Sequence, residues 1–147
     1  MFAFDEIAIY WANRLGFAVR AELAVRFREA GFNVTPKEWA ILLLLWRERE
    51  LSVSAIADAT FRDKTTVSRL VERMVNKGLV ERQPDAVDRR KTILRPTAQA
   101  LELQDQLVPV ARELVADAQG DISPKDVQLV ARTLQTMTEN LLSSASK

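Results

Sequence analysis

Residues 51–97 constrain the fold of this chain more than any other part, because several short elements follow one another there with little room for loops. SVSAIADAT predicts a short helix over 53–60, and KTTVSRLVERMVNK predicts a second helix over 64–77. Asp63 can cap the second helix, and Gly78 stands where a left-handed residue commonly ends one. Two consecutive helices with so short a connection predict a helix-turn-helix.

Two short runs with strand-like alternation follow the second helix. They span 79–82 and 91–94, and the turn-forming sequence PDAVD lies between them. We expect a two-stranded wing here. Residues 51–53 are either a further short strand or an extended lead into the first helix.

Positive charge is concentrated on this part of the chain. Residues 62–95 contain ten lysine or arginine residues and five aspartate or glutamate residues, a balance of +5, whereas the whole chain carries +1. The remaining residues therefore carry −4. A near-neutral protein with its positive charge on one element has the electrostatic pattern expected for binding phosphate groups.

Longer helices are predicted on both sides of this segment. Thr35 and Glu38 can form a capping box at the start of an apolar core helix, and Gly31 can end the helix before it. A polar tail, SSASK, follows the last helix. The helices span 4–30, 36–47, 98–119 and about 124–142.

The end helices have more apolar surface than the core of one 147-residue domain can cover, so we expect them to pair with a second copy of the chain. The expected fold is mainly α-helical with a small β-wing, in a single protomer. Residues 35–97 would form a winged helix-turn-helix lobe. Residues 4–34 and 98–147 would form the dimerisation helices.

The composition excludes several classes of function. The chain contains no cysteine and no histidine, which excludes disulfides, thiol chemistry and catalysis of the Ser-His-Asp type. The commonest zinc, copper and nickel ligands are absent too, so we expect no metal, no cofactor and no enzymatic activity. The longest apolar run, 39–46, is too short to span a membrane, and no signal peptide is recognisable. We therefore expect a cytoplasmic protein.

The second helix of the helix-turn-helix carries the residues expected to contact DNA. The major groove is about 12 Å wide and admits one helix, which reads bases with short hydrogen-bonding side chains or long cations. Any solvated basic helix face has a similar composition, but the preceding helix and the wing favour DNA contact. The candidates on this helix are Lys64, Thr65, Thr66, Ser68, Arg69 and Arg73.

The wing turn carries three consecutive cations, Arg89, Arg90 and Lys91. These cations repel one another and do not stabilise the fold. We therefore expect them to contact a DNA minor groove or the phosphates beside that groove. Asp88 precedes them. It either pairs with an arginine and fixes the geometry of the tip, or serves only as a turn-forming residue.

The run KTTVSRLVERMVNKGLVERQPDAVDRRKTILRPT resembles the MarR family of bacterial transcriptional regulators, in which TV(S/T)RLV, KGLVxR and DRR occur in this order. The order of the long helices extends the resemblance to about 4–142. It implies a homodimer whose first and last helices form the interface, with two recognition helices in successive major grooves of a pseudo-palindromic operator. The residues that match the family's recognition-helix and wing positions are Thr65, Thr66, Ser68 and Arg69, and Asp88 and Arg90.

Many proteins of that family respond to small aromatic acids, so a ligand pocket is also expected. Trp11, Arg14, Phe17 and Trp39 are the candidates, because an aromatic box with one cation suits a benzoate-like anion. Aromatic residues at helical spacing belong to the core more often than to a ligand pocket. Thiol oxidation is excluded as a signal because the chain has no cysteine.

The sequence thus favours a dimeric regulator that binds double-stranded DNA sequence-specifically, with repression favoured because occupying a promoter blocks polymerase. The alternative is a winged-helix protein-interaction module whose basic wing binds an acidic partner. A magnesium-dependent enzyme is disfavoured, because the carboxylates in this region occupy capping and turn positions without a repeated ligand spacing. These carboxylates are Asp58, Asp63, Asp85 and Asp88.

Overall fold

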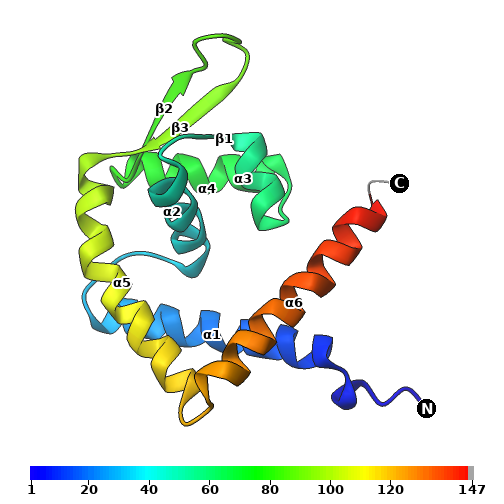
Figure 1. Ribbon diagram of the computed structural model, residues 1–147. Coiled ribbons are helices and arrows are strands. Elements are labelled where there is room, and N and C mark those ends of the chain that lie inside the picture. Colours follow the sequence, from blue (N-terminus) through cyan, green and yellow to red (C-terminus); the bar gives the residue numbers. More distant parts are fainter. Residues whose placement is uncertain (146–147) are drawn as a thin grey trace. The chain divides into compact units, whose positions relative to one another are not determined.

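The computed structural model describes residues 1–145, which form two compact units (Figure 1). The larger unit comprises Glu22–Ala111, and the smaller comprises Met1–Ala21 with the chain from Arg112 onward. The division therefore falls inside the first and fifth α-helices. The elements are η1 (a 3-10 turn, Phe4–Glu6), α1 (Ala8–Glu29), α2 (Pro36–Glu48), β1 (Leu51–Ser52), α3 (Val53–Thr60), α4 (Lys64–Asn76), β2 (Val80–Pro84), β3 (Thr92–Pro96), α5 (Ala98–Gln119) and α6 (Pro124–Ala145).

Side-chain caps fix where the helices of the larger unit begin. The predicted capping box of α2 is confirmed: the Glu38 backbone N–H donates to Thr35 Oγ1 at 3.2 Å, and the Thr35 N–H donates to Glu38 Oε1 at 2.9 Å. Ser52 Oγ accepts from the Ala55 N–H at 3.0 Å and starts α3. These bonds satisfy N–H groups that would have no partner inside the helix.

The core of the larger unit lies between α2, α3, α4 and the sheet. The predicted apolar face of α4 is buried, with Val67, Leu70, Val71 and Met74 at most 3% exposed. Most of the middle of α2 is buried as expected, but Ala40 and Leu44 are half-buried and Leu43 is 44% exposed. The α2 residues in this core are Ile41, Leu42, Leu45 and Trp46.

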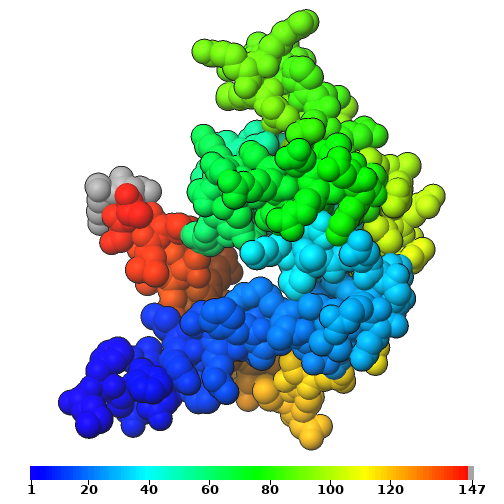
Figure 2. All heavy atoms as spheres, turned by 180° about the vertical axis from the view of Figure 1, so that it is seen from behind, coloured from blue at the N-terminus to red at the C-terminus, as the bar shows by residue number. Residues whose placement is uncertain are grey.

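The sheet has three antiparallel strands in the order β1-β3-β2. The predicted wing strands are confirmed as β2 and β3, and β1 is the short strand that was one of the two alternatives for 51–53. Leu51 of β1 pairs with Leu94 of β3, which satisfies the extended backbone that leads into α3. The β2–β3 hairpin runs from the Val80–Pro96 pair to the Pro84–Thr92 pair, one to two residues further along the chain than expected. This hairpin projects from the rest of the larger unit (green in Figure 2).

The first predicted helix begins later than expected. Ile7 is extended, at φ −99° and ψ 127°, and separates η1 from α1. Aromatic contacts and a hydrogen bond hold this turn on the helix: Tyr10 packs edge-on against Phe4 and Trp11, and Trp11 Nε1 donates to the Asp5 carbonyl at 2.7 Å. These contacts favour a 3-10 turn over a continuous helix from Phe4.

The last helix is longer than expected. It continues through Ser143 and Ser144 to Ala145, although the sequence predicted a polar tail there. Ser146 and Lys147, the end of that predicted tail, lie outside the described residues. Serine has only a modest helix penalty, so the end of α6 can extend past its apolar positions.

Arg49, directly after α2, offers a test of local strain. Its φ of 71° and ψ of −35° are unfavourable for an L side chain but accessible to glycine. We predict that Arg49→Gly raises the free energy of unfolding by about 0.5–1 kcal/mol, because relief of strain exceeds the added entropy of the unfolded chain. Guanidinium denaturation measures this.

The matched control is Arg47→Gly, two residues earlier and inside α2. Glycine should lower the stability there by about 1 kcal/mol, because the backbone is already helical. If both substitutions lowered the denaturation midpoint equally, the backbone at Arg49 would not be strained.

Candidate nucleic-acid interface

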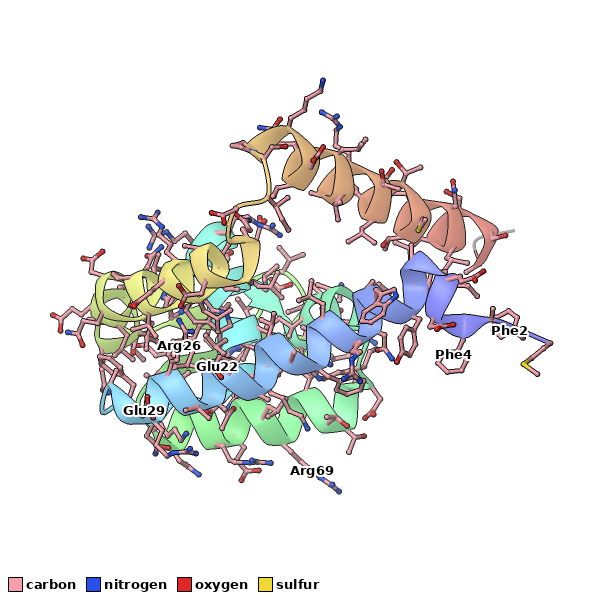
Figure 3. All side chains as sticks on the ribbon, turned by 90° about the horizontal axis from the view of Figure 1, so that it is seen from below. Phe2, Phe4, Glu22, Arg26, Glu29 and Arg69 are labelled. Atoms are coloured by element: carbon pink, nitrogen blue, oxygen red, sulfur yellow. The ribbon has the colours of Figure 1, made fainter. Side chains whose placement is uncertain are left out.

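The solvent-facing side of α4 lies opposite its buried stripe. Because apolar residues three and four positions apart occupy one side of the helix, the polar residues between them must face outward. In Figure 3, Arg69 extends from α4 away from the ribbon. The predicted residues on this helix that are exposed are Lys64, Thr65, Ser68, Arg69 and Arg73.

Thr66 is half-buried and is engaged in the cap of α4. Its backbone N–H donates to Asp63 Oδ1 and its hydroxyl donates to Asp63 Oδ2, both at 2.8 Å. These two bonds favour the charged carboxylate and lower the pKa of Asp63 below its ordinary value of 3.8. Thr66 therefore helps to fix the first turn of α4, beside the exposed Thr65.

The wing tip is held by its own hydrogen bonds. The Asp85 N–H donates to the Lys91 carbonyl at 3.0 Å, and the Lys91 N–H donates to the Asp88 carbonyl at 3.0 Å. The Val87 N–H donates to Asp85 Oδ1 at 3.1 Å. The three wing cations are exposed, and this backbone scaffold presents them together.

Asp88 accepts both a backbone and a side-chain hydrogen bond from Arg90. Arg90 Nε donates to Asp88 Oδ1 at 3.1 Å, and the Arg90 N–H donates to the same oxygen at 3.1 Å. Both bonds lower the pKa of Asp88 below its ordinary value of 3.8, and the side-chain bond from Arg90 has the larger effect. The two roles considered for Asp88, arginine partner and turn former, therefore occur together.

The base of the wing is fixed to α5 and to the segment before β1. The Thr97 hydroxyl donates to the Gly78 carbonyl at 2.6 Å and accepts from the Ala100 N–H at 3.1 Å, so it also caps α5. Arg95 Nη2 lies 2.6 Å from Glu50 Oε2, so this arginine forms an ion pair within the lobe. Both contacts limit the movement of the hairpin against the helices.

One open cleft of about 400 Å³ brings the helix and the wing together. From the predicted set, Lys64 and Ser68 line it from α4, and Arg90 and Lys91 line it from the wing. Thr65, Arg69, Arg73 and Arg89 do not line this cleft. The lining residues that sequence reasoning did not identify as contacts are Ser52, Val53, Ser54 and Thr92.

The cleft has the chemistry of a phosphate site. It combines three cationic side chains with hydroxyl groups near the N-terminal ends of α3 and α4, where helix dipoles favour anions. The serines at the start of α3 could have been identified from their place in a helix-turn-helix, because the first helix of that motif approaches the DNA backbone. Within residues 1–145, no cluster of three or more acidic side chains could hold a metal ion.

The residues predicted to form a ligand pocket lie in different surroundings. In the smaller unit, Arg14 and Phe17 line a pocket of about 450 Å³ along α1, and Trp11, 53% exposed, does not line it. The other pocket-lining residues are Tyr10, Asn13 and Ala18.

In the larger unit, Trp39 belongs to an aromatic row. Its ring centroid lies 5.2 Å from that of Phe27 and 5.6 Å from that of Trp46. This packing is what the core interpretation of Trp39 implies. Ligand contact by the four residues stays a prediction.

No helix in the described part of the chain has the length and apolar character needed to cross a bilayer.

Comparisons with known proteins agree with this geometry. The sequence model of the MarR family matches residues 32–91, from just before α2 to the wing tip. The chain is 26% identical over 137 residues to the HTH-type transcriptional repressor IacR of Pseudomonas putida, covering 93% of this chain and 81% of that protein. It is 25% identical to the organic hydroperoxide resistance transcriptional regulator of Bacillus subtilis, covering 74% of this chain and 73% of that protein.

Solved structures share the fold. A MarR transcriptional regulator from Methanosarcina mazei superposes with a TM-score of 0.80 at 23% identity, covering 97% of this chain and 99% of that one. The PcaV transcriptional regulator from Streptomyces coelicolor, solved in complex with its natural ligand, superposes with a TM-score of 0.77 at 17% identity, covering 95% and 96%. The MarR family model thus matches the winged lobe, and the chain is similar along most of its length to named transcriptional regulators and to solved MarR structures of the same fold.

Proposed function

We propose that this protein is a transcriptional regulator that binds double-stranded DNA sequence-specifically as a homodimer, and that it represses from a pseudo-palindromic operator. The observation that carries the proposal is the cleft in which Lys64 and Ser68 of α4 meet Arg90 and Lys91 of the wing. Relatives named as repressors support the same function.

In the proposed complex, α4 lies in the major groove and the cleft holds the phosphate backbone beside it. Arg69 is exposed on α4 and can donate two hydrogen bonds to guanine, whereas the hydroxyl of Thr65 suits a base edge or a phosphate. Arg89 at the wing tip does not line the cleft and can enter the adjacent minor groove. Phosphate contacts then supply affinity, and the α4 side chains supply sequence preference.

The proposed dimer rests on the apolar surface of the smaller unit. α6 is 22 residues long and has no buried residue. A helix with an exposed apolar stripe needs a partner surface, and cyclic dimers are the commonest solution. Most of the large exposed apolar side chains among residues 1–145 belong to this unit. They include Phe4, Ile9, Leu15, Leu129, Val130, Leu141 and Leu142.

A small aromatic acid is proposed as the effector. The α1 pocket offers the Arg14 guanidinium for a carboxylate and the Phe17 and Tyr10 rings for an aromatic group. The structure of PcaV with its natural ligand shows that a protein of this fold binds a ligand. Binding would release DNA if the ligand prefers a conformation in which the two recognition helices no longer fit the operator.

The first prediction concerns the DNA face. Arg90→Ala should weaken binding to most duplexes alike and reduce the salt slope by about 0.9, because one phosphate contact is lost. Arg69→Ala should weaken the free energy of binding to the operator by about 1–3 kcal/mol and relax the base preference at one operator position. Both are measured by titrating the protein onto a labelled duplex from upstream of its own gene and onto a scrambled duplex.

Lys125→Ala on α6 is the control, because it removes a cation outside the winged lobe. If all three variants bound like the wild type at moderate salt, the DNA face would be misplaced. If the wild type bound neither duplex in a salt-dependent way, the alternative of a protein-interaction module with an acidic partner would be favoured.

The second prediction concerns the dimer. Leu141 is 69% exposed in the protomer, so Leu141→Asp should leave the fold intact and yield monomers, because a carboxylate would be buried in the interface. Sedimentation equilibrium with circular dichroism measures both properties. The neighbouring Asn140→Asp introduces the same charge at a polar position and should stay dimeric. A native dimer of Leu141→Asp would exclude this part of α6 from the interface.

The third prediction concerns the effector. Benzoate and phenylacetate are suitable probes, and calorimetry should detect binding that Arg14→Met abolishes, because the carboxylate loses its cation. Arg28→Met, at the other end of α1, is the matched control. If neither benzoate nor phenylacetate bound to the wild type, or if Arg14→Met bound them equally well, the proposed ligand pocket would be wrong.

A further inference from the structure

A buried ion pair in the larger unit takes no part in the surface described above. Lys77 Nζ lies 2.8 Å from Glu38 Oε1, and the two side chains are 27% and 2% exposed. Lys77 is the residue that ends α4, and Glu38 lies in the first turn of α2. The pair therefore joins the far end of the DNA-reading helix to the start of the core helix.

Both partners make a second contact that fixes the direction of the pair. Glu38 Oε1 also accepts from the backbone N–H of Thr35, within the capping box of α2. Lys77 Nζ also donates to the carbonyl of Asn33 at 3.0 Å. The end of α4 is thus held between the capping box and the backbone that precedes it.

A contribution to the stability of the fold does not account well for the Glu38–Lys77 ion pair. Glu38 Oε2 is buried and accepts no hydrogen bond from the described residues, so the carboxylate is only partly satisfied. Taking two charges out of water is costly. A protein with apolar residues of similar volume in place of a buried ion pair is often equally stable or more stable. A hydrogen-bonded pair differs from apolar packing chiefly in being directional.

We propose that Glu38 and Lys77 are positioning residues that set the angle of α4 against α2 and thereby the placement of the DNA-reading side chains. The proposal rests on the proposed DNA-binding function. The apolar stripe of α4 fixes its rotation but is not directional along the helix axis. With a rise of 1.5 Å per residue, Lys77 stands about 18 Å from Thr65, so a shift of about 1 Å at Lys77 tilts the helix by roughly 3°.

Such a tilt acts on sequence preference more than on general affinity. Hydrogen bonds to base edges lose strength over a few tenths of an ångström, as bidentate contacts from Arg69 would. Long cations on phosphates tolerate small displacements, because their attraction is electrostatic. Loss of the pair should therefore lower discrimination between duplexes while the non-specific affinity stays the same.

The double variant Glu38→Met/Lys77→Met replaces the pair with apolar side chains of similar length. We expect a folded protein with an unfolding free energy only slightly below that of the wild type, because the capping box also loses its carboxylate, and an affinity for a scrambled duplex within about twofold. Preference for a duplex selected by the wild type from a random pool should fall by about tenfold. The control, Arg47→Gln/Glu48→Gln, neutralises an exposed pair on α2 and should keep full preference.

A double variant that folds and keeps wild-type preference would overturn the proposal. Lys77→Met is the second variant, in case the first does not fold, because it removes both hydrogen bonds of the Lys77 ammonium and leaves the capping box of α2 intact. It should also lose preference without a matching loss of non-specific affinity. Wild-type preference in Lys77→Met would overturn the proposal equally.

A DNA-free measurement separates this proposal from the proposed function. Residual dipolar couplings report the direction of the α4 N–H bonds relative to those of α2. We expect them to change in either variant and not in the Arg47→Gln/Glu48→Gln control. If the wild type shows no preference among duplexes, the proposed function fails while the couplings still decide on the pair. Couplings identical to those of the wild type in a folded variant would overturn the positioning role.

Discussion

The burial of one face of α4 is the constraint on which the candidate DNA surface depends. Val67, Leu70, Val71 and Met74 are buried in the larger unit, and each contributes roughly 1.5–3 kcal/mol relative to exposure. Because these four residues form one stripe, any rotation of α4 would expose apolar side chains and bury Arg69. The hydrophobic core thereby determines which side chains are available to DNA.

Electrostatic contacts at the ends of the elements complete what the core begins. Asp63 fixes the first turn of α4, Lys77 holds its last turn on α2, and Asp88 orders the wing tip around Arg90. The cations that face the cleft are therefore placed by hydrogen bonds made elsewhere in the lobe. A site ordered before it meets DNA loses less conformational entropy on binding, which is why these contacts matter for function.

Local signals in the sequence predicted much of the fold. The starts of α3 and α5 follow from side-chain caps at Ser52 and Thr97, which act within three residues of the helix start. The pairing of β1 with β3 could not be predicted, because two residues are too few to show alternation. The Glu38–Lys77 contact joins residues 39 positions apart and has no local signature.

The candidate site was predictable in its residue types but not in its grouping. The exposed basic face of α4 and the three wing cations follow from periodicity and charge, whereas the cleft that gathers Lys64, Ser68, Arg90 and Lys91 depends on how the hairpin packs. The engagement of Thr66 in the cap of α4 likewise depends on a side-chain rotamer that the sequence does not specify.

The central claim is that α4 and the wing form a DNA-binding surface used twice in a symmetric complex. Chemical footprinting on a duplex selected by the protein from a random pool tests it most directly. Two patches of protected guanine N7 atoms about 10 base pairs apart, each flanked by a protected minor groove, are the result expected for two recognition helices. A single protected patch, or protection without periodic spacing, would contradict the claim.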